Sequence, residues 1–390
     1  MTRLTYLSEA AIPSRSSNAT ATVRMCGAFA DAGADVTLVY PRLQQPEPEG
    51  FAGDVAAFYG IADAIERRVL HVPHAKGRSP LQRIARSRPF AAYLGGRMRG
   101  GQPSFICYTR TFQLAWLALQ VRRAWGRRGA CRALIMEVHG EPPKRGWSLL
   151  SSVDGVVVIS EMLRQRILER LPQLEGRVWV EHSGVDLSAV HRGADRAEAR
   201  ARIGCADAAG PLVVYAGRVF KGKGVDVLIE AAERVSDIGA RVLVVGNVYE
   251  DEYVSRAPDN VTFTGFVAPS EVPDYLAAAD MMVMPTTESL HYSRYTSPLK
   301  LFEYLATGNP VVVSDLPVLR EVVRDGENAL LYPPRDADAL AGALRRLWSD
   351  RALGVKLADQ AWQDVQQYSW QRRAQRILER VDGLADAGAR

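Results

Sequence analysis

Short apolar runs alternate with helical patterns along most of the chain, and this alternation restricts the possible folds more than any other feature. The runs fall at residues 4–7, 35–40, 105–109, 133–138 and 155–160, and again at 211–217, 240–246, 260–266, 281–285 and 309–315. Short runs of this kind, rich in apolar and β-branched residues, are typical of parallel strands buried on both faces. Strands that alternate with helices predict doubly wound α/β domains.

The chain length predicts more than one domain. A chain of 390 residues exceeds what a single hydrophobic core usually supports. A polar segment rich in alanine and arginine, residues 187–210, separates the two sets of strands and is predicted to be a linker. We expect an N-terminal domain over residues 1–186, a C-terminal domain over 187–366, and a final helix over 367–390 that packs back toward the N-terminal domain.

The basic residues are unevenly distributed. No Asp or Glu occurs between Arg67 and Met136, whereas this stretch holds fifteen Lys or Arg. Such a stretch attracts anionic surfaces, for which a membrane leaflet and a lipid pyrophosphate are the candidates. Nucleic acid is not expected, because no recognised binding motif accompanies the charge. Arginines interleaved with apolar residues over 81–97 predict an interfacial amphipathic segment; the alternative is a solvated arginine-rich surface.

The remaining composition predicts a cytoplasmic protein, peripheral on the inner face of the plasma membrane. The first residues do not have the pattern of a signal peptide, and no apolar run is long enough to span a bilayer. The four cysteines match no zinc or redox spacing, which favours reduced thiols.

The segment YAGRVFKGKGVDVLIEA, residues 215–231, predicts a strand, a basic glycine-rich loop and a helix. Free N–H groups at a helix N-terminus bind anions. Arg218 and Lys223 would add charge-assisted bonds to a diphosphate beside the Gly217 backbone. The loop is neither a Walker loop nor a GxGxxG loop, and its alternative interpretation is an ordinary solvated loop.

The segment SPLKLFEYLATGNPVVVSD, residues 297–315, is the second candidate site. Ser297 and Pro298 are expected to start a helix, because proline is favoured in the first turn. Lys300 and Glu303 lie on one helix face and suit a surface ion pair. Alternatively, the free amides and the lysine hold a phosphate, and the glutamate accepts hydrogen bonds from ribose hydroxyls.

His139 ends the apolar run at residues 133–138, where a cleft edge is expected. Glu137, two residues earlier, points to the same side of an ideal strand. It either orients the imidazole or pairs with another group. The histidines suggest no metal site, and no Asp-x-Asp motif occupies a plausible metal-binding position.

These motifs together resemble the retaining, GT-B-fold glycosyltransferases of family 4, also described as glycosyl transferases group 1. The resemblance covers most of residues 211–381, and the SPLKLFEY form of the helix motif resembles one subgroup. The first half matches more loosely, through VTLVYPR, EVHGEP and VVVIS. The resemblance implies two Rossmann-like domains that face each other across a cleft.

The resemblance also implies roles for single residues. Arg218 and Lys223 match the residues that bind the donor diphosphate, and Glu303 matches the residue that binds the ribose. His139 matches a histidine near the donor sugar. The backbone at Phe266 and Val267 lies where the family contacts the base.

Two positions depart from the family pattern. The family's first motif glutamate falls on Tyr295, and Glu288 is the candidate replacement. The family's Gly-Gly turn after the first strand is replaced by SRSSNAT, residues 14–20. Asn18 is expected to cap the next helix, and its contact with phosphate is left open.

The resemblance implies sugar transfer from a nucleotide-diphosphate sugar to a glycan or lipid-linked acceptor, with retention of configuration, in the synthesis of cell-surface polysaccharides or glycoconjugates. No cofactor and no metal are expected, because cationic groups would stabilise the leaving diphosphate. No protein nucleophile is assigned. Two alternatives stay open, namely a catalytically inactive nucleotide-binding partner subunit and a sugar-nucleotide 2-epimerase.

Overall fold

A computed structural model gives the structure of the protein. It describes residues 1–42, 48, 51–61, 65–71, 80–99, 103–125, 130–190, 192–193, 195–207, 210–268, 271–287 and 293–387. The chain forms two compact units. The first comprises Met1–His182 and Trp370–Arg390, and the second is Ser183–Ser369. The sequence analysis placed these two divisions after residues 186 and 366.

The first unit is built on a seven-stranded parallel sheet with the strand order β3-β2-β1-β4-β5-β6-β7. The central strands are apolar and buried, as their sequences predict. The strands are β1 (Arg3–Leu7), β2 (Asp35–Arg42), β3 (Glu66–His71), β4 (Phe105–Thr109), β5 (Cys131–Val138), β6 (Gly155–Val158) and β7 (Val178–Val180).

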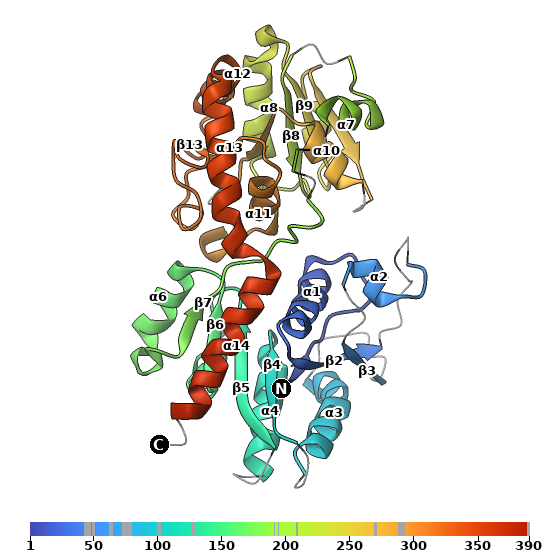
Figure 1. The fold of residues 1–390 in the computed structure, drawn as a ribbon, viewed down its shortest axis with the longest axis vertical. Helices are drawn as coiled ribbons and strands as arrows, with labels where there is room; N and C mark the ends of the chain where they lie inside the picture. The colour runs from blue at the N-terminus through green and yellow to red at the C-terminus, as the bar shows by residue number, and fades with distance from the viewer. Residues whose placement is uncertain are drawn as a thin grey trace. The chain divides into compact units, whose positions relative to one another are not determined.

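Helices flank this sheet, and the last helix of the chain is one of them. Helix α14 (Trp370–Ala387) lies beside α1 (Ser17–Asp31) and contacts β5 (Figure 1). The other helices are α2 (Val55–Tyr59), α3 (Pro80–Arg97), α4 (Phe112–Trp125), α5 (Gly146–Leu150) and α6 (Glu161–Arg170).

The second unit is built on a six-stranded parallel sheet with the strand order β10-β9-β8-β11-β12-β13. Its strands are β8 (Leu212–Ala216), β9 (Arg241–Val245), β10 (Val261–Gly265), β11 (Met281–Met284), β12 (Val311–Ser314) and β13 (Leu330–Tyr332). Helices α8 (Val225–Arg234) and α12 (Ala337–Ser349) pack side by side over one core (Figure 1). The other helices are α7 (Arg196–Arg202), α9 (Glu252–Ser255), α10 (Val272–Ala278), α11 (Leu299–Ala306) and α13 (Arg351–Val365).

Both halves therefore have the predicted architecture of helices around a parallel sheet. The short strands β3, β7 and β13 were not predicted. The predicted linker over residues 187–210 is not an extended connection, because it contains α7, which packs against α10. Salt bridges from Arg196 and Arg200 to Asp280 fasten α7 to the second unit.

The amphipathic segment over residues 81–97 turns part of its apolar side toward the core. Phe90 and Leu94 of α3, and Met98 just after it, are buried in the first unit. An i, i+4, i+8 stripe that faces a core accounts for this burial. Among the described residues, no helix is both long and apolar enough to cross a bilayer.

Candidate functional site

Three loops meet at the carboxyl edge of the six-stranded sheet. The Gly217 N–H donates to the Val245 carbonyl at 2.8 Å, and the Gly246 N–H donates to the Gly265 carbonyl at 3.0 Å. A Cβ atom on Gly246 would lie 2.3 Å from the Gly217 oxygen. The loops after β8 and β9 and the end of β10 therefore pack backbone against backbone, which only glycine permits at Gly246.

The loop after β8 holds the two predicted diphosphate-binding cations near one aromatic ring. The Arg218 guanidinium lies 5.8 Å and the Lys223 Nζ 5.3 Å from the centre of the Phe220 ring. Burial, and then the neighbouring Arg218, lower the pKa of Lys223. Since an anion between two cations favours the charged form of both, this loop suits a diphosphate.

Gly224 fixes how this loop enters α8. It is the N-cap of the helix, with a φ of 74°, and a Cβ atom there would lie 1.6 Å from the Pro285 oxygen. The Thr287 N–H and hydroxyl both donate to the Gly222 carbonyl at 3.2 Å. The loop is thus pinned to the segment that follows β11, and the α8 N-terminus is held at the sheet edge.

Helix α11 begins at Leu299, with Pro298 as its N-cap, one residue later than predicted. Lys300 Nζ lies 3.0 Å from Glu303 Oε2, so the surface pair permitted by their spacing is formed. Both side chains are partly exposed. They therefore remain accessible to a ligand, which would compete with this pair for hydrogen bonds.

Tyr304 connects α11 to the loop after β8, and sequence reasoning did not single it out. Its buried hydroxyl accepts the Ala216 N–H at 2.6 Å and donates to the Ala216 carbonyl at 3.1 Å. Ala216 is the last residue of β8 and immediately precedes Gly217. The contact brings the helix of Lys300 and Glu303 close to the loop of Arg218 and Lys223, so both motifs share one sheet edge.

Three other predicted binding residues have different surroundings. The Ser297 hydroxyl accepts the Ser183 N–H at 2.9 Å, and the Ser183 hydroxyl donates to the Ser297 carbonyl at 2.6 Å. The Ser297 hydroxyl thus uses one of its acceptor positions within the unit, which leaves the O–H group as the donor for its predicted ligand contact. Phe266 is exposed after β10, and Val267 beside it is half-buried.

The predicted replacement of the missing glutamate, Glu288, lies outside the described residues. Tyr295, which occupies the motif position of that glutamate, is only 4% exposed. A carboxylate at this position would be buried, which is costly without a partner. The tyrosine is therefore part of the packing of this segment.

In the first unit, His139 follows β5 at the carboxyl edge of the seven-stranded sheet. Its Nε2 atom lies 2.6 Å from Glu137 Oε1, which confirms that Glu137 can orient the imidazole. Its Nδ1 atom lies 3.0 Å from Arg110 Nη2. Burial and the nearby Arg110 lower the pKa of His139 to about 4, so the ring is neutral near pH 7.

Glu137 is buried within a larger polar network. The Tyr108 hydroxyl donates to its Oε2 atom, and Arg373 Nη2 donates to its Oε1 atom at 3.0 Å. Burial alone would raise the pKa of this carboxyl, but Arg373 and Arg110 hold it well below its ordinary value. Arg110 and Arg373 were not predicted, because neither lies in a local motif and Arg373 is distant in sequence.

The prediction that Asn18 caps the helix was wrong. Ser16 is the N-cap of α1, and its side chain accepts the Ala19 N–H. Ser16 has the extended backbone of an N-cap, whereas Asn18 already lies inside the helix. The role of Asn18 at a phosphate stays a prediction.

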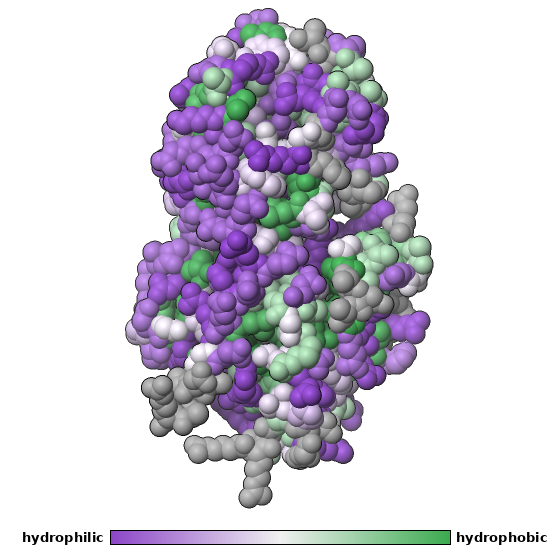
Figure 2. Space-filling model, viewed as in Figure 1, coloured by the Kyte–Doolittle hydropathy of each residue, from purple (hydrophilic) through white to green (hydrophobic). Residues whose placement is uncertain are grey.

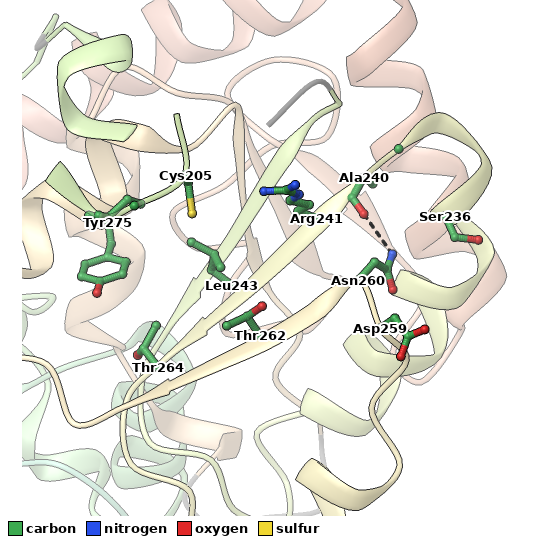
Figure 3. Close-up of a pocket in the computed structure, with 13 residues that line it drawn as sticks. Cys205, Ser236, Ala240, Arg241, Leu243, Asp259, Asn260, Thr262, Thr264 and Tyr275 are labelled. Atoms are coloured by element: carbon green, nitrogen blue, oxygen red, sulfur yellow. Dashed lines mark hydrogen bonds between the residues drawn. The ribbon is translucent and has the colours of Figure 1, made fainter. Parts of the chain in front are cut away.

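A cavity of about 610 Å³ lies elsewhere on the second unit. Leu243, Thr262 and Thr264 extend from neighbouring strands of the sheet, with Cys205 and Tyr275 opposite (Figure 3). Arg241 at its rim is paired with Asp207. None of the predicted site residues lines this cavity, so it is separate from the sheet edge described above.

Two family comparisons cover both halves of the chain. Residues 19–189 match the family described as Glycosyltransferase Family 4. Residues 210–350 match the family described as Glycosyl transferases group 1.

Individual proteins agree with these matches. A D-inositol 3-phosphate glycosyltransferase of Corynebacterium urealyticum is 28% identical over 62% of this chain and 60% of its own. A phosphatidyl-myo-inositol mannosyltransferase of Mycobacterium leprae is 29% identical over 46% and 49%. The chain thus spans about half to three fifths of these relatives' lengths. The Anabaena protein Alr3699/HepE, solved with UDP-glucose, superposes with a TM-score of 0.71 at 17% identity over 98% and 100% of the two chains, which confirms the GT-B fold.

Proposed function

Because the chain belongs to the family 4 glycosyltransferases, also described as glycosyl transferases group 1, we propose that it transfers a sugar from a nucleotide-diphosphate sugar to a glycan or lipid-linked acceptor. The observation that carries this proposal is the loop of Arg218 and Lys223, two nearby cations at a helix N-terminus. The names of the two relatives support an acceptor of the inositol phosphate or lipid class. The reaction belongs to the synthesis of cell-surface polysaccharides or glycoconjugates.

The chemistry requires stabilisation of the leaving group. As the glycosidic bond to the diphosphate breaks, negative charge grows on the phosphate oxygens and the sugar becomes oxocarbenium-like. In this proposal, Arg218, Lys223 and Lys300, together with the N–H groups at the start of α8, stabilise that charge. We assign this work to them and expect transfer without a metal ion, which persistence of activity in excess EDTA would test.

The stereochemical proposal is retention. The acceptor hydroxyl attacks from the face that the diphosphate leaves, and the departing phosphate accepts the hydroxyl proton. This scheme assigns no nucleophile to the protein. Nuclear magnetic resonance of the freshly formed product reads the anomeric configuration directly, and an inverted product would exclude it.

Glu303 is proposed to accept hydrogen bonds from the ribose hydroxyls. Replacement by alanine removes a charged acceptor, and such bonds contribute about 1.5–3 kcal/mol. Glu303→Ala should therefore lose about ten- to a hundredfold in kcat/KM for the donor while the protein stays folded. A near-normal rate in the folded variant would exclude the ribose role. Glu327→Ala is the control, because Glu327 also forms an i, i+3 pair with an arginine, Arg324.

The first experiment is a thermal-shift panel of nucleotide sugars, followed by an assay for released nucleoside diphosphate. One stabilising donor whose diphosphate release rises when a glycan or lipid-linked acceptor is added would support a transferase. Stabilisation without release across the acceptor panel would favour the inactive partner subunit. Conversion of the donor sugar without an acceptor would favour a sugar-nucleotide 2-epimerase.

We further propose that the first unit docks on an anionic membrane at the cytoplasmic face. On α4, Trp116 and Trp125 are 55% and 42% exposed, and Arg123 is exposed beside them. Exposed arginines of the α3 segment, Arg88 and Arg99, belong to the same stretch without acidic residues. Tryptophan and arginine together suit a negatively charged interface. Figure 2 shows that hydrophilic side chains cover much of the visible face.

Vesicle binding tests this docking. Vesicles of phosphatidylcholine with phosphatidylserine should bind the protein at low salt and release it as salt rises. Trp116→Ser should weaken binding, whereas Val355→Ser, at an exposed apolar residue of α13, should not. Absence of binding at low salt would exclude the proposal.

A further inference from the structure

The C-terminal helix reaches the sheet edge of the first unit through one arginine. Arg373, in the first turn of α14, is 2% exposed, and Glu137 on β5 is 3% exposed. Arg373 Nη2 lies 3.0 Å from Glu137 Oε1. The guanidinium is thus a buried partner of the carboxylate that contacts His139, although 236 residues separate the two in sequence.

Arg373 also binds the chain where it leaves the first unit. Its Nε donates to the His182 carbonyl at 2.8 Å, and its Nη2 donates to the Glu181 carbonyl at 3.3 Å. The chain leaves this unit after His182 and returns at Trp370. One guanidinium therefore ties the departing segment, the returning helix and Glu137 together.

The hydrogen bonds of His139 determine which ring nitrogen carries the proton. An arginine only donates, so Nδ1, 3.0 Å from Arg110 Nη2, must accept. The ring hydrogen of the neutral imidazole is then on Nε2, which donates to Glu137 Oε1 at 2.6 Å. Glu137 accepts a further hydrogen bond from the Tyr108 hydroxyl. This arrangement requires that Glu137 be ionised.

We propose that Arg373 is a positioning residue for His139: it keeps Glu137 ionised, and Glu137, together with Arg110, fixes the orientation and the Nε2–H tautomer of the imidazole. The proposal rests on the proposed function, in which His139 lies near the donor sugar. It makes the final helix of the chain part of the machinery of the first unit, and it accounts for a buried charge that packing alone does not require.

The surroundings of Glu137 show what loss of Arg373 would do. The titratable and charged groups that face Glu137 are Tyr6, Tyr108, Arg110, His139 and Arg373. Without Arg373, burial would raise the pKa of the Glu137 carboxyl, opposed mainly by Arg110. A protonated Glu137 carboxyl carries an O–H donor beside its remaining acceptor, so it would compete with Arg110 for the position of the ring proton, and His139 would no longer hold a single tautomer.

The test compares two arginines of the same helix in the full chain. Arg376 is the matched control, because its Nε lies 2.9 Å from Oε2 of buried Glu181, so it also docks α14, but through the carboxylate of Glu181. We would label the six histidines with ¹⁵N and assign His139 through His139→Asn. The Nε2–H pattern should persist in Arg376→Met and be lost in Arg373→Met.

Kinetics with the donor from the nucleotide-sugar panel give the second readout. A distant substitution that misplaces a catalytic group can lower the reaction rate up to about a hundredfold. Arg373→Met should lower kcat about ten- to a hundredfold with little change in donor KM, and should add an ionisation near neutral pH that the wild type lacks. Arg376→Met should stay within about twofold of wild type, and Arg373→Lys should restore the wild-type pH profile.

If Arg373→Met does not fold, two other variants test the proposal. Glu137→Gln should lose the Nε2–H tautomer of His139, and Arg373→Lys should retain it. An unchanged tautomer in Arg373→Met or Glu137→Gln would overturn the proposal, as would equal effects of Arg373→Met and Arg376→Met. The tautomer is measured without substrate. A tautomer that follows Arg373 in a protein that turns over no donor would therefore contradict the transferase function and leave the coupling intact.

Discussion

The two sheet edges hold their functional groups by different means. At the edge of the second unit, glycine contacts and short loops place Arg218 and Lys223 beside their neighbours in sequence. At the edge of the first unit, His139 depends on a buried network that reaches to Arg373. The comparison teaches that backbone shape and neighbours in sequence form the proposed phosphate site, whereas the imidazole of His139 takes its side-chain partners from distant elements.

The largest expected effect tests the phosphate side of this comparison. Lys223→Ala should lower kcat about a hundredfold or more, because it removes a cation from the leaving diphosphate. Lys221→Ala removes an exposed lysine of the same loop and should change kcat less than about twofold. Initial rates of nucleoside diphosphate release measure both variants, and equal rates would contradict the assignment.

The role of backbone shape is tested by two glycines. Gly224→Ala should lower the free energy of unfolding of the second unit by more than about 2 kcal/mol, because of its positive φ and its contact with Pro285. Gly342 lies on the exposed side of α12 with nothing within 4 Å of an added Cβ atom. Gly342→Ala should therefore raise the free energy of unfolding of the second unit by about 0.4–1 kcal/mol. Calorimetric unfolding measures both, and a harmless Gly224→Ala would refute the backbone argument.

The histidines of the first unit should make it sensitive to acid. The folded pKa of His139 and of His182 is lowered to about 4, mainly by burial, whereas an unfolded histidine titrates near 6.5. As pH falls, the unfolded chain binds protons first, so stability is lost between about pH 6.5 and 4. Because part of the His139 side chain is exposed, we expect each histidine to lower the free energy of unfolding by only about 1 kcal/mol at pH 5.

Calorimetry of the full chain from pH 7 to pH 5 measures this loss. The transition of the first unit should move to lower temperature as pH falls, and His182→Asn should reduce the shift. A pH-independent transition in the wild type would contradict the neutral state of these rings.

The smallest expected effect concerns the cap of α1. Ser16→Ala should lower the free energy of unfolding of the first unit by about 0.5–1 kcal/mol, because it removes the acceptor for the Ala19 N–H. Asn18 lies inside the helix, so Asn18→Ala should change the free energy of unfolding by only about a few tenths of a kcal/mol. Denaturant unfolding of the two variants distinguishes them, and a larger loss from Asn18→Ala would restore the original cap assignment.

The sequence predicted the second unit better than the first for a physical reason. Strand β8, its loop and α8 form one continuous motif whose composition reveals both the turn and the charge. By contrast, in the first unit β7 has only three residues and β3 is rich in charge, so neither gives a clear apolar pattern. In the second unit, β13 was missed for the same reason as β7, because it also has only three residues.

The partners of the motif residues could not be predicted. Tyr304 reaches Ala216, and Arg373 reaches Glu137, only because the fold brings distant segments together. The burial of Tyr295 was likewise invisible in the sequence. Its burial argues that Tyr295→Glu would disturb packing before it restored a family contact.

The most direct test of the central claim is calorimetric titration of UDP, GDP and ADP, each against its monophosphate. If the loop of Arg218 and Lys223 holds the donor diphosphate, the matching nucleoside diphosphate should bind at least about tenfold tighter than its monophosphate, which corresponds to about 1.4 kcal/mol. That preference should disappear in Lys223→Ala and persist in Lys221→Ala. Equal affinity for diphosphate and monophosphate in the wild type, or a preference that survives Lys223→Ala, would contradict the account.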